Sequence, residues 1–117
     1  MRESLRQKQS RFVRLMGLLI EYAYSHGFEL TAGELWRTPE QAKLNTERGL
    51  GIANSLHTER LAVDFNVFRG GKWLQSADEI RPLGEYWESL DADCAWGGRF
   101  TRPVDPGHFS IRHGGRA

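Results

Sequence analysis

Residues 55–64 read Ser-Leu-His-Thr-Glu-Arg-Leu-Ala-Val-Asp, and residues 105–108 read Asp-Pro-Gly-His. Together these stretches supply the imidazoles of His57 and His108 and the carboxylates of Asp64 and Asp105. Two imidazoles and one carboxylate can form a three-ligand zinc site whose fourth position stays open for water. The second carboxylate could then take a proton from that water. The two stretches therefore predict a zinc site that carries its own general base.

His57 and Asp64 can share such a site only if the chain turns between them. They are seven residues apart, and an odd separation along one strand places two side chains on opposite faces. The intervening residues 58–60 are polar enough to turn. Asp64 then lies in an apolar strand next to Val63 and Phe65. A carboxylate there is costly to bury unless it is paired or bound to metal, which favours Asp64 as a ligand.

Each of these residues also has an ordinary interpretation. Asp64 could face solvent beside Asn66, and His57 could be a surface histidine. Asp105 precedes Pro106 and is a normal turn residue. The order and spacing of the set, rather than any single member, favour the metal site.

The composition indicates one globular domain. With 117 residues, 39% of them hydrophobic, the chain can bury a core without disulfides. Its 16 basic and 15 acidic residues leave a net charge of +1, which argues against a large nucleic-acid footprint. The basic residues near the N-terminus are interpreted as the solvated face of a helix. They are Arg2, Arg6, Lys8, Arg11 and Arg14.

Cysteine use and hydropathy bear on location and chemistry. Cys94 is the only cysteine, so no internal disulfide can form, and the sequence points to no base that would activate its thiol. No apolar run reaches the roughly 18 residues of a membrane span. Residues 15–20 are apolar, but the run is short, is followed by Glu21 and lacks a cleavage site. We therefore expect a cytoplasmic product with no signal peptide of its own and no stable membrane insertion.

Two helices are predicted in the first half of the chain. Apolar residues at helical spacing indicate a helix over about residues 4–26. A second helix begins at Thr38, with Pro39 in its first turn and Gln41 completing a capping box, and it runs to about Arg48.

The second half is expected to contain a third helix and several short strands. Ser76 and Glu79 form a capping box for a helix over 77–90. Pro82 lies inside this helix and should either kink it or move its start. The remaining segments are a strand over 61–68, a turn over 69–72, a hairpin arm over 72–74, a loop over 96–100, a last strand over 108–111 and a frayed tail over 112–117.

This order of elements predicts an α+β class with a small, mostly antiparallel sheet and helices packed on one side. We expect a single domain over residues 1–117. It consists of the N-terminal helix over about 4–26 and a metal-site core over about 28–112.

The motifs resemble those of the zinc D-alanyl-D-alanine carboxypeptidase and L-alanyl-D-glutamate endopeptidase family. The shared pattern is Ser-x-His-x-x-x-x-Ala-x-Asp at 55–64, followed by acid-x-x-His at 105–108. It also includes Trp-Arg-Thr at 36–38 and Trp-Gly-Gly at 96–98. The short length and the Trp-Gly-Gly-Arg-Phe stretch look most like bacteriophage endolysins of this family.

The resemblance implies a single-domain zinc peptidase fold and a role for each site residue. His57, Asp64 and His108 would bind one Zn²⁺, and Asp105 would act as general base and acid. Arg37 would polarise the scissile carbonyl. Many members have glycine three residues after the first histidine, where this chain has Arg60, and some use glutamate as the base.

The remaining candidates have weaker assignments. Ser55 would lie near the metal and could touch substrate. Trp96 could form a wall of the cleft or fill core space, and His113 could assist the transition state or lie exposed. Arg37, without the resemblance, would be interpreted as a salt bridge before a helix, and His26 as a helix C-terminal cap. Trp36, Trp73 and Trp87 are expected in the core.

The function that the resemblance implies is a monomeric, zinc-dependent peptidoglycan endopeptidase that cuts the peptide stem, at the L-Ala–D-Glu bond, in phage-type host lysis. Such an enzyme would stay in the host cytoplasm until a holin-type partner let it reach the periplasm and cell wall. The alternatives are a D-Ala-D-Ala carboxypeptidase or dipeptidase and a non-catalytic, zinc-containing cell-wall-binding module. Asp105 argues against the last, since a pure binder needs no proton acceptor.

Overall fold

The computed structural model describes residues 2–47, 55–101 and 103–117. Helix α1 (Leu5–Ser25) begins at Ser4, whose hydroxyl accepts a hydrogen bond from the backbone N–H of Gln7, and the Gln7 side chain completes the capping box. This confirms the predicted N-terminal helix. Its buried stripe recurs at helical spacing, as expected for an amphipathic helix packed on a core, and consists of Phe12, Leu15, Leu19 and Ala23.

Helix α2 (Pro39–Glu47) starts where the sequence predicts. The Thr38 hydroxyl accepts a hydrogen bond from the Gln41 N–H at 2.9 Å. The Gln41 side chain, however, bonds forward to Asn45 rather than serving as the second half of a capping box. The predicted helix end at Arg48 lies outside the described residues.

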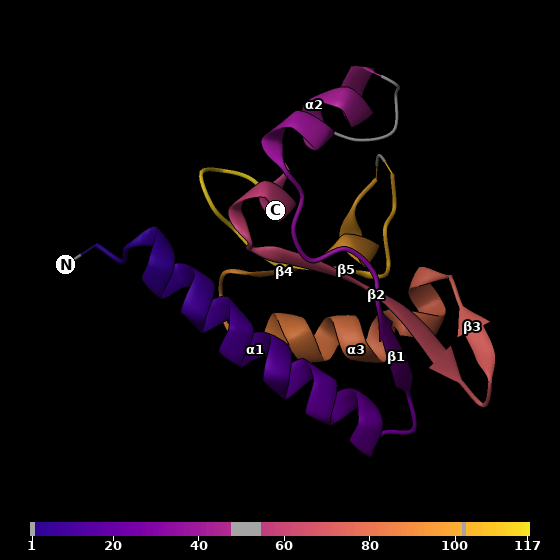
Figure 1. Cartoon of the computed structure of the whole chain (residues 1–117). Helices are drawn as coiled ribbons and strands as arrows, with labels where there is room; N and C mark the ends of the chain where they lie inside the picture. The colour runs from indigo at the N-terminus through magenta and orange to yellow at the C-terminus, as the bar shows by residue number, and fades with distance from the viewer. Residues whose placement is uncertain (1, 48–54, 102) are drawn as a thin grey trace.

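The sheet is antiparallel throughout the described chain, and its order is β1-β2-β5-β4, with β3 also paired to β2. Strand β2 is the longest and lies at the centre (Figure 1). It is joined to β3 by Gly70 and Gly71, whose positive φ angles of 58° and 79° suit the tight turn that the sequence predicted. The strands are β1 (Glu29–Ala32), β2 (Ala62–Arg69), β3 (Lys72–Leu74), β4 (Cys94–Trp96) and β5 (His108–Ile111).

Helix α3 (Ala77–Leu90) has the predicted capping box at Ser76 and Glu79. Pro82 lies inside this helix and does not reset its start. Proline has no backbone N–H, so the helix lacks one backbone hydrogen bond at Pro82. The burial of Ile80, Leu83 and Trp87 offsets this loss of stability.

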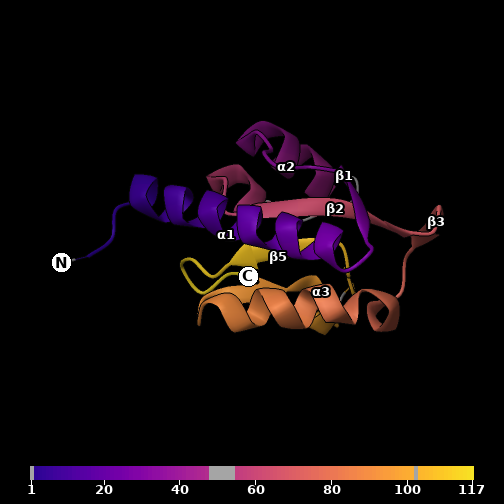
Figure 2. The ribbon, with the colours of Figure 1, turned by 90° about the horizontal axis from the view of Figure 1, so that it is seen from below.

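Helices α1 and α3 lie together against one face of the sheet, whereas α2 lies on the opposite side of the molecule (Figures 1 and 2). The core between the helices and the sheet is aromatic. Trp87 meets Phe12 and Phe109 edge to face, with ring centroids 5.8 and 6.0 Å apart. Its indole N–H donates to the carbonyls of Ala95 and Ser110 on β4 and β5. This arrangement agrees with the predicted α+β class.

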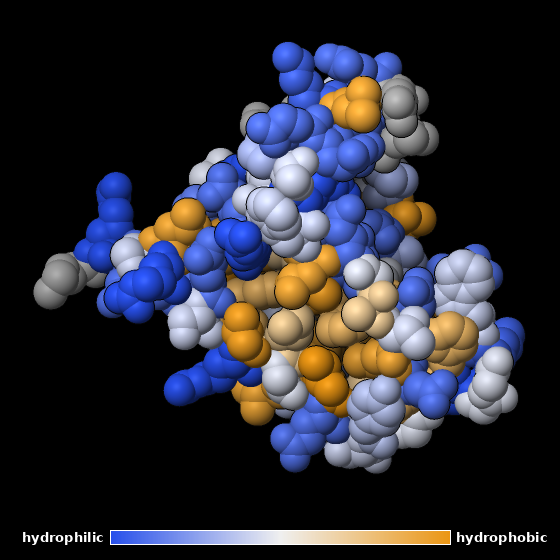
Figure 3. Space-filling view, viewed as in Figure 1, coloured by the Kyte–Doolittle hydropathy of each residue, from blue (hydrophilic) through white to orange (hydrophobic). Residues whose placement is uncertain are grey.

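The hydropathy of the surface follows these layers. In the orientation of Figure 1, hydrophobic residues gather over the middle of the molecule, and the surface over α2 is mostly hydrophilic (Figure 3). Ala42 is the only residue of α2 that is buried. Among the described residues, none of the helices is long and apolar enough to cross a membrane.

Two expected irregular segments are ordered by backbone pairing instead. The predicted loop at 96–100 contains the end of β4 and a 3-10 turn, η2 (Gly97–Arg99). The expected frayed tail is held by paired hydrogen bonds between His113 and Arg116, and the Arg112 N–H donates to the Asp93 carbonyl at 2.8 Å. Backbone pairing of this kind cannot be recognised from local composition.

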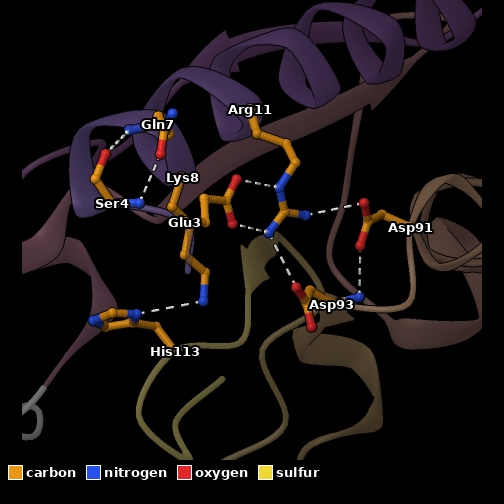
Figure 4. A network of polar contacts seen from close by, with 8 residues as sticks. All are labelled: Glu3, Ser4, Gln7, Lys8, Arg11, Asp91, Asp93 and His113. Carbon is orange, nitrogen blue, oxygen red and sulfur yellow. Dashed lines mark hydrogen bonds and ion pairs between the residues drawn. The ribbon is translucent and has the colours of Figure 1, made fainter. Parts of the chain in front are cut away.

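The basic residues of α1 are not all solvated. Arg11 bridges Glu3 to Asp91 and Asp93, which follow α3, with N–O distances of 2.9 to 3.0 Å (Figure 4). Its side chain is only about one-quarter exposed. These ion pairs connect the first turns of α1 to the end of α3, so for Arg11 the solvated-face interpretation is wrong.

Candidate metal centre

The alternation of side chains along β2 assigns the polar site to the sheet face away from α1 and α3. Val63 and Val67 are buried in the core between the sheet and these helices. Asp64 has the opposite parity and so points the other way. His108 lies directly across from it on β5 and shares its face.

His57 reaches the same place from a short 3-10 turn, η1 (Leu56–Glu59). The Ser55 hydroxyl caps this turn by accepting a hydrogen bond from the His57 N–H at 3.2 Å. The turn ends at Arg60, whose left-handed backbone, with φ 58° and ψ 38°, leads the chain into β2. The expected turn between His57 and Asp64 is confirmed, and the structure gives Ser55 a positioning role.

Three ligand atoms converge at this point. His57 Nε2 lies 3.4 Å, and His108 Nδ1 lies 3.3 Å, from the same oxygen, Asp64 Oδ1. All three ligand atoms are within 4.8 Å of one another, and both imidazoles are buried. The structure therefore brings the three predicted ligands together.

This arrangement fits a zinc ion. Tetrahedral ligands at about 2.0–2.1 Å from zinc are separated from one another by about 3.3 Å, close to the two spacings around Asp64. His57, Asp64 and His108 could thus hold the ion, and that they do so stays a prediction.

The charges of the site favour an ionised Asp64. Burial acts to raise the pKa of this carboxyl, but hydrogen bonds with His108 and His57 outweigh it and hold the pKa well below its ordinary value. A metal ligand must be deprotonated, so the site presents Asp64 in the form that binds a cation.

Asp105 lies on the loop that leads into β5. Its N–H donates to the Gly97 carbonyl at 2.9 Å, and its own carbonyl accepts from the His108 N–H. A methyl group at Gly97 would approach the Asp105 carbonyl to 2.0 Å, so only glycine allows this contact. Burial, and then the negative charge of Asp64, raise the pKa of Asp105, and both histidines partly offset this. Such an environment makes a carboxylate a better proton acceptor.

Arg37 approaches the site beside Glu34, which the sequence analysis did not single out. The segment that carries both runs along the site: the Asp64 N–H donates to the Glu34 carbonyl at 2.7 Å, and the Arg37 N–H donates to the His57 carbonyl at 3.2 Å. The Arg37 guanidinium pairs with Glu34 Oε1, which lies 3.6 Å from His57 Nδ1. The Glu-x-x-Arg spacing could have suggested the ion pair, but not its approach to His57.

The left-handed backbone at Arg60 explains why many members of the family have glycine at this position. A left-handed backbone costs a residue with a Cβ roughly 1–2 kcal/mol, and glycine avoids this cost. Arg60 is the only described residue other than glycine with a positive φ. Its guanidinium lies 4.6 Å from the ring centroid of Trp36, which offsets part of the cost.

A pair of substitutions isolates this backbone effect. Arg60→Gly and Arg60→Ala both remove the contact with Trp36, but only glycine relieves the left-handed strain. We expect the glycine variant to be more stable than the alanine variant by about 1 kcal/mol in urea unfolding. Arg69 is a matched control, since it also stacks on a ring, that of Phe28, but lies in strand β2. At that position the alanine variant should be the more stable, and the same order at both positions would contradict the explanation.

The burial of the four tryptophans differs from the prediction. Trp87 and Trp96 are buried, at 0% and 1% exposure, so Trp96 fills core space and offers no wall to a cleft. Methyl groups at Gly84 or Gly98 would collide with its ring. Trp36 and Trp73, expected in the core, are 44% and 52% exposed.

The two other histidines lie apart from the three converging ligands. His113 is half-buried against α1, where its Nδ1 is 3.3 Å from the Lys8 ammonium (Figure 4). It is therefore neither fully exposed nor among the described groups that could hold the metal. His26 is the C-cap of α1 and its Nδ1 lies 2.8 Å from the Tyr22 carbonyl, in agreement with the capping interpretation.

Cys94 is buried in β4, and burial, followed by the charge of Asp91, raises the pKa of its thiol to about 12. The thiolate is the reactive form, so we expect no measurable alkylation of the native protein by iodoacetamide at pH 8. In guanidinium chloride the thiol should react at the rate of an ordinary cysteine. Mass spectrometry of the two samples checks this, and rapid alkylation of the folded protein would contradict it.

Comparison with known proteins agrees with this geometry. Residues 48–111 match the family model described as D-alanyl-D-alanine carboxypeptidase. The fold resembles the crystal structure of the L-Ala D-Glu endopeptidase ChiX of Serratia marcescens, with a TM-score of 0.67 and 19% identity over 88% of this chain and 79% of that one. It also resembles the vancomycin resistance D,D-pentapeptidase VanY of a VanB-type cassette in complex with Zn(II), with a TM-score of 0.56 and 18% identity over 86% and 70% of the two chains. Comparison with curated protein sequences gave no match.

The fold and the converging ligands define a zinc metallopeptidase of the class that acts on peptidoglycan. The family match covers more than half of the chain. The chain belongs to the D-alanyl-D-alanine carboxypeptidase family.

Proposed function

We propose that this protein is an endopeptidase of the peptidoglycan stem that hydrolyses the L-Ala–D-Glu bond. The observation that carries this choice is the likeness in fold to ChiX, named as an L-Ala D-Glu endopeptidase, with a TM-score of 0.67. The likeness to VanY, named as a D,D-pentapeptidase, is weaker, with a TM-score of 0.56.

In this proposal, His57, Asp64 and His108 hold the zinc ion. The ion, when bound, supplies a Lewis acid and lowers the pKa of a coordinated water to about 7. Asp105 accepts the proton of the attacking water and transfers it to the nitrogen of the leaving amine. Its burial and raised pKa suit both steps.

Arg37 is proposed to stabilise the negative charge that develops on the scissile carbonyl oxygen. The ion pair with Glu34 holds the Arg37 guanidinium in place. The Arg37 side chain is only 14% exposed. A preorganised cation of this kind pays little reorganisation energy when the charge appears.

The biological setting is proposed from the resemblance of residues 96–100 to bacteriophage endolysins. A monomer made in the host cytoplasm would reach the periplasm and cell wall through a holin-type partner. Bacteria that express the chain together with a membrane-permeabilising protein should then lyse, and those that express the chain alone should not. Lysis by the chain alone would contradict the need for such a partner.

The bond is tested by digesting purified peptidoglycan with the zinc-loaded protein and identifying the new termini by mass spectrometry. New amino groups on D-Glu support the proposal. Release of free D-Ala would instead establish the carboxypeptidase, which the family description and the likeness to VanY keep as the second candidate. Binding to the cell wall without any soluble product would establish the non-catalytic module.

A further inference from the structure

A pocket opens along one edge of β2, between the segments of β2 that pair with β5 and with β3. Strand β5 pairs with β2 at Ala62–Asp64, and β3 pairs with the same edge at Val67–Arg69. In the interval between them, the Phe65 N–H donates to the Gly107 carbonyl at 2.8 Å, and Phe65 and Asn66 are partly exposed. A pocket of about 320 Å³ lies at this interval, at the low end of the size range of small-molecule sites.

The pocket is continuous with the metal centre. Its lining includes Asp64 and Asp105 of the proposed site, and also Asn66, Trp73 and Gln75. In the proposed reaction Asp105 gives a proton to the leaving amine. The group attached to that amine therefore starts at Asp105, and the pocket provides its path along the sheet.

The remaining lining residues offer peptide-binding chemistry. The Gln75 amide can donate and accept hydrogen bonds. The Asn66 Nδ2 donates to Thr31 Oγ1 at 3.1 Å, and its amide oxygen can still accept a hydrogen bond. Phe68 and Trp73 lie opposite each other across β2 and β3, so Trp73 shares the sheet face of Asp64. Its indole is 52% exposed, a flat surface on which a peptide can pack.

We propose that this pocket binds the stem-peptide segment that departs with the amine, and that Trp73 makes the enzyme prefer a long leaving group. The proposal rests on the endopeptidase function. Cleavage before D-Glu releases the remainder of the stem, which needs such a path. Cleavage before a terminal D-Ala releases one small amino acid, which does not.

The test uses the zinc-loaded protein and two peptides that share the L-Ala–D-Glu bond, one ending at D-Glu and one continuing along the stem. For the wild type, kcat/KM should be at least about tenfold higher on the long peptide. Trp73→Ala should raise KM for the long peptide about tenfold with a smaller change in kcat, so that the ratio of long to short falls toward one. Trp73→Phe should keep most of the preference. Tyr24→Ala, which removes an exposed aromatic on α1, is the control and should leave the ratio as in the wild type.

A binding measurement provides a second readout that does not depend on turnover. The product peptide that begins with free D-Glu is titrated into the wild-type protein, and the NMR signals of the Trp73 indole and of the Asn66 and Gln75 side-chain amides are followed. These signals should shift together and saturate. Unshifted signals, or an unchanged ratio in Trp73→Ala while the L-Ala–D-Glu bond is still cut, would overturn the pocket assignment and leave the proposed function intact. Failure to cut either peptide, with D-Ala released from a D-Ala–D-Ala peptide, would overturn the proposed function itself.

Discussion

Asp105→Asn is expected to leave the protein folded and loaded with zinc but about 10²–10⁴-fold less active on purified peptidoglycan. The amide has the shape of the carboxylate and cannot accept a proton, so it removes the proposed acid–base group alone. Metal content by elemental analysis and the rate of soluble product release are the two measurements. Asp78→Asn is a matched control, because Asp78 has a side chain that is 91% exposed and pairs only locally with Arg81.

The pH dependence of the wild type gives an independent check on Asp105. The group must be ionised to accept a proton, so activity is present above its pKa and is lost as pH falls through it. Since burial raises this pKa, the acid limb of kcat/KM should lie above the range of an ordinary aspartate, near 3.9. The residual activity of Asp105→Asn should lack that limb. Full lytic rate in the variant, or an identical acid limb, would show that another group is the base.

Replacing any proposed ligand should abolish stoichiometric zinc binding. His57→Ala, Asp64→Ala and His108→Ala each remove one of the three atoms that converge within 4.8 Å, and two ligands are too few for a stable site. We expect about one zinc per wild-type chain and less than about one-tenth of that in each variant. Activity should fall at least as far as in Asp105→Asn, because the metal and the bound water are lost together.

Thermal unfolding separates loss of metal from loss of fold. A ligand that binds only the native state stabilises it by about 4 kcal/mol when present at 1,000 times its dissociation constant. A chelator should therefore lower the unfolding midpoint of the wild type and have no effect on the three variants. His26→Ala, at the end of α1, is the control and should keep both the zinc and the chelator response. A variant such as His108→Ala that still bound one zinc would exclude that residue as a ligand.

The helices and the β2–β3 hairpin could be predicted from local sequence patterns. Ser4 and Ser76 cap α1 and α3, and the Gly70-Gly71 turn joins the hairpin, as the sequence predicted. These features depend on residues a few positions apart, which is the range over which capping and turn chemistry act. The loop expected at 96–100 and the frayed tail were wrong partly because of pairing with distant segments: Trp96 pairs with Phe109, and the Arg112 N–H donates to the Asp93 carbonyl. The pairing of His113 with Arg116 is local, but composition alone does not reveal it.

The burial of the tryptophans could not be predicted from local sequence either. Residue type favours burial for all four, but exposure depends on which sheet face and which element covers each ring. Trp87 packs against Phe12 of α1, whereas Trp73, on the β3 arm of the hairpin, is 52% exposed. Local sequence does not contain that information.

The sequence by itself predicted the residues of the site, because the types and spacing of His57, Asp64, Asp105 and His108 indicate zinc peptidase chemistry. Tertiary structure decided how the set is assembled. The left-handed backbone at Arg60 turns His57 toward Asp64, and antiparallel pairing of β2 with β5 places His108 opposite that carboxylate. It also brought Glu34 to the site and exposed Trp73 beside the pocket. The physical reason is that side-chain chemistry is a property of each residue, whereas strand register and burial depend on contacts across the whole chain.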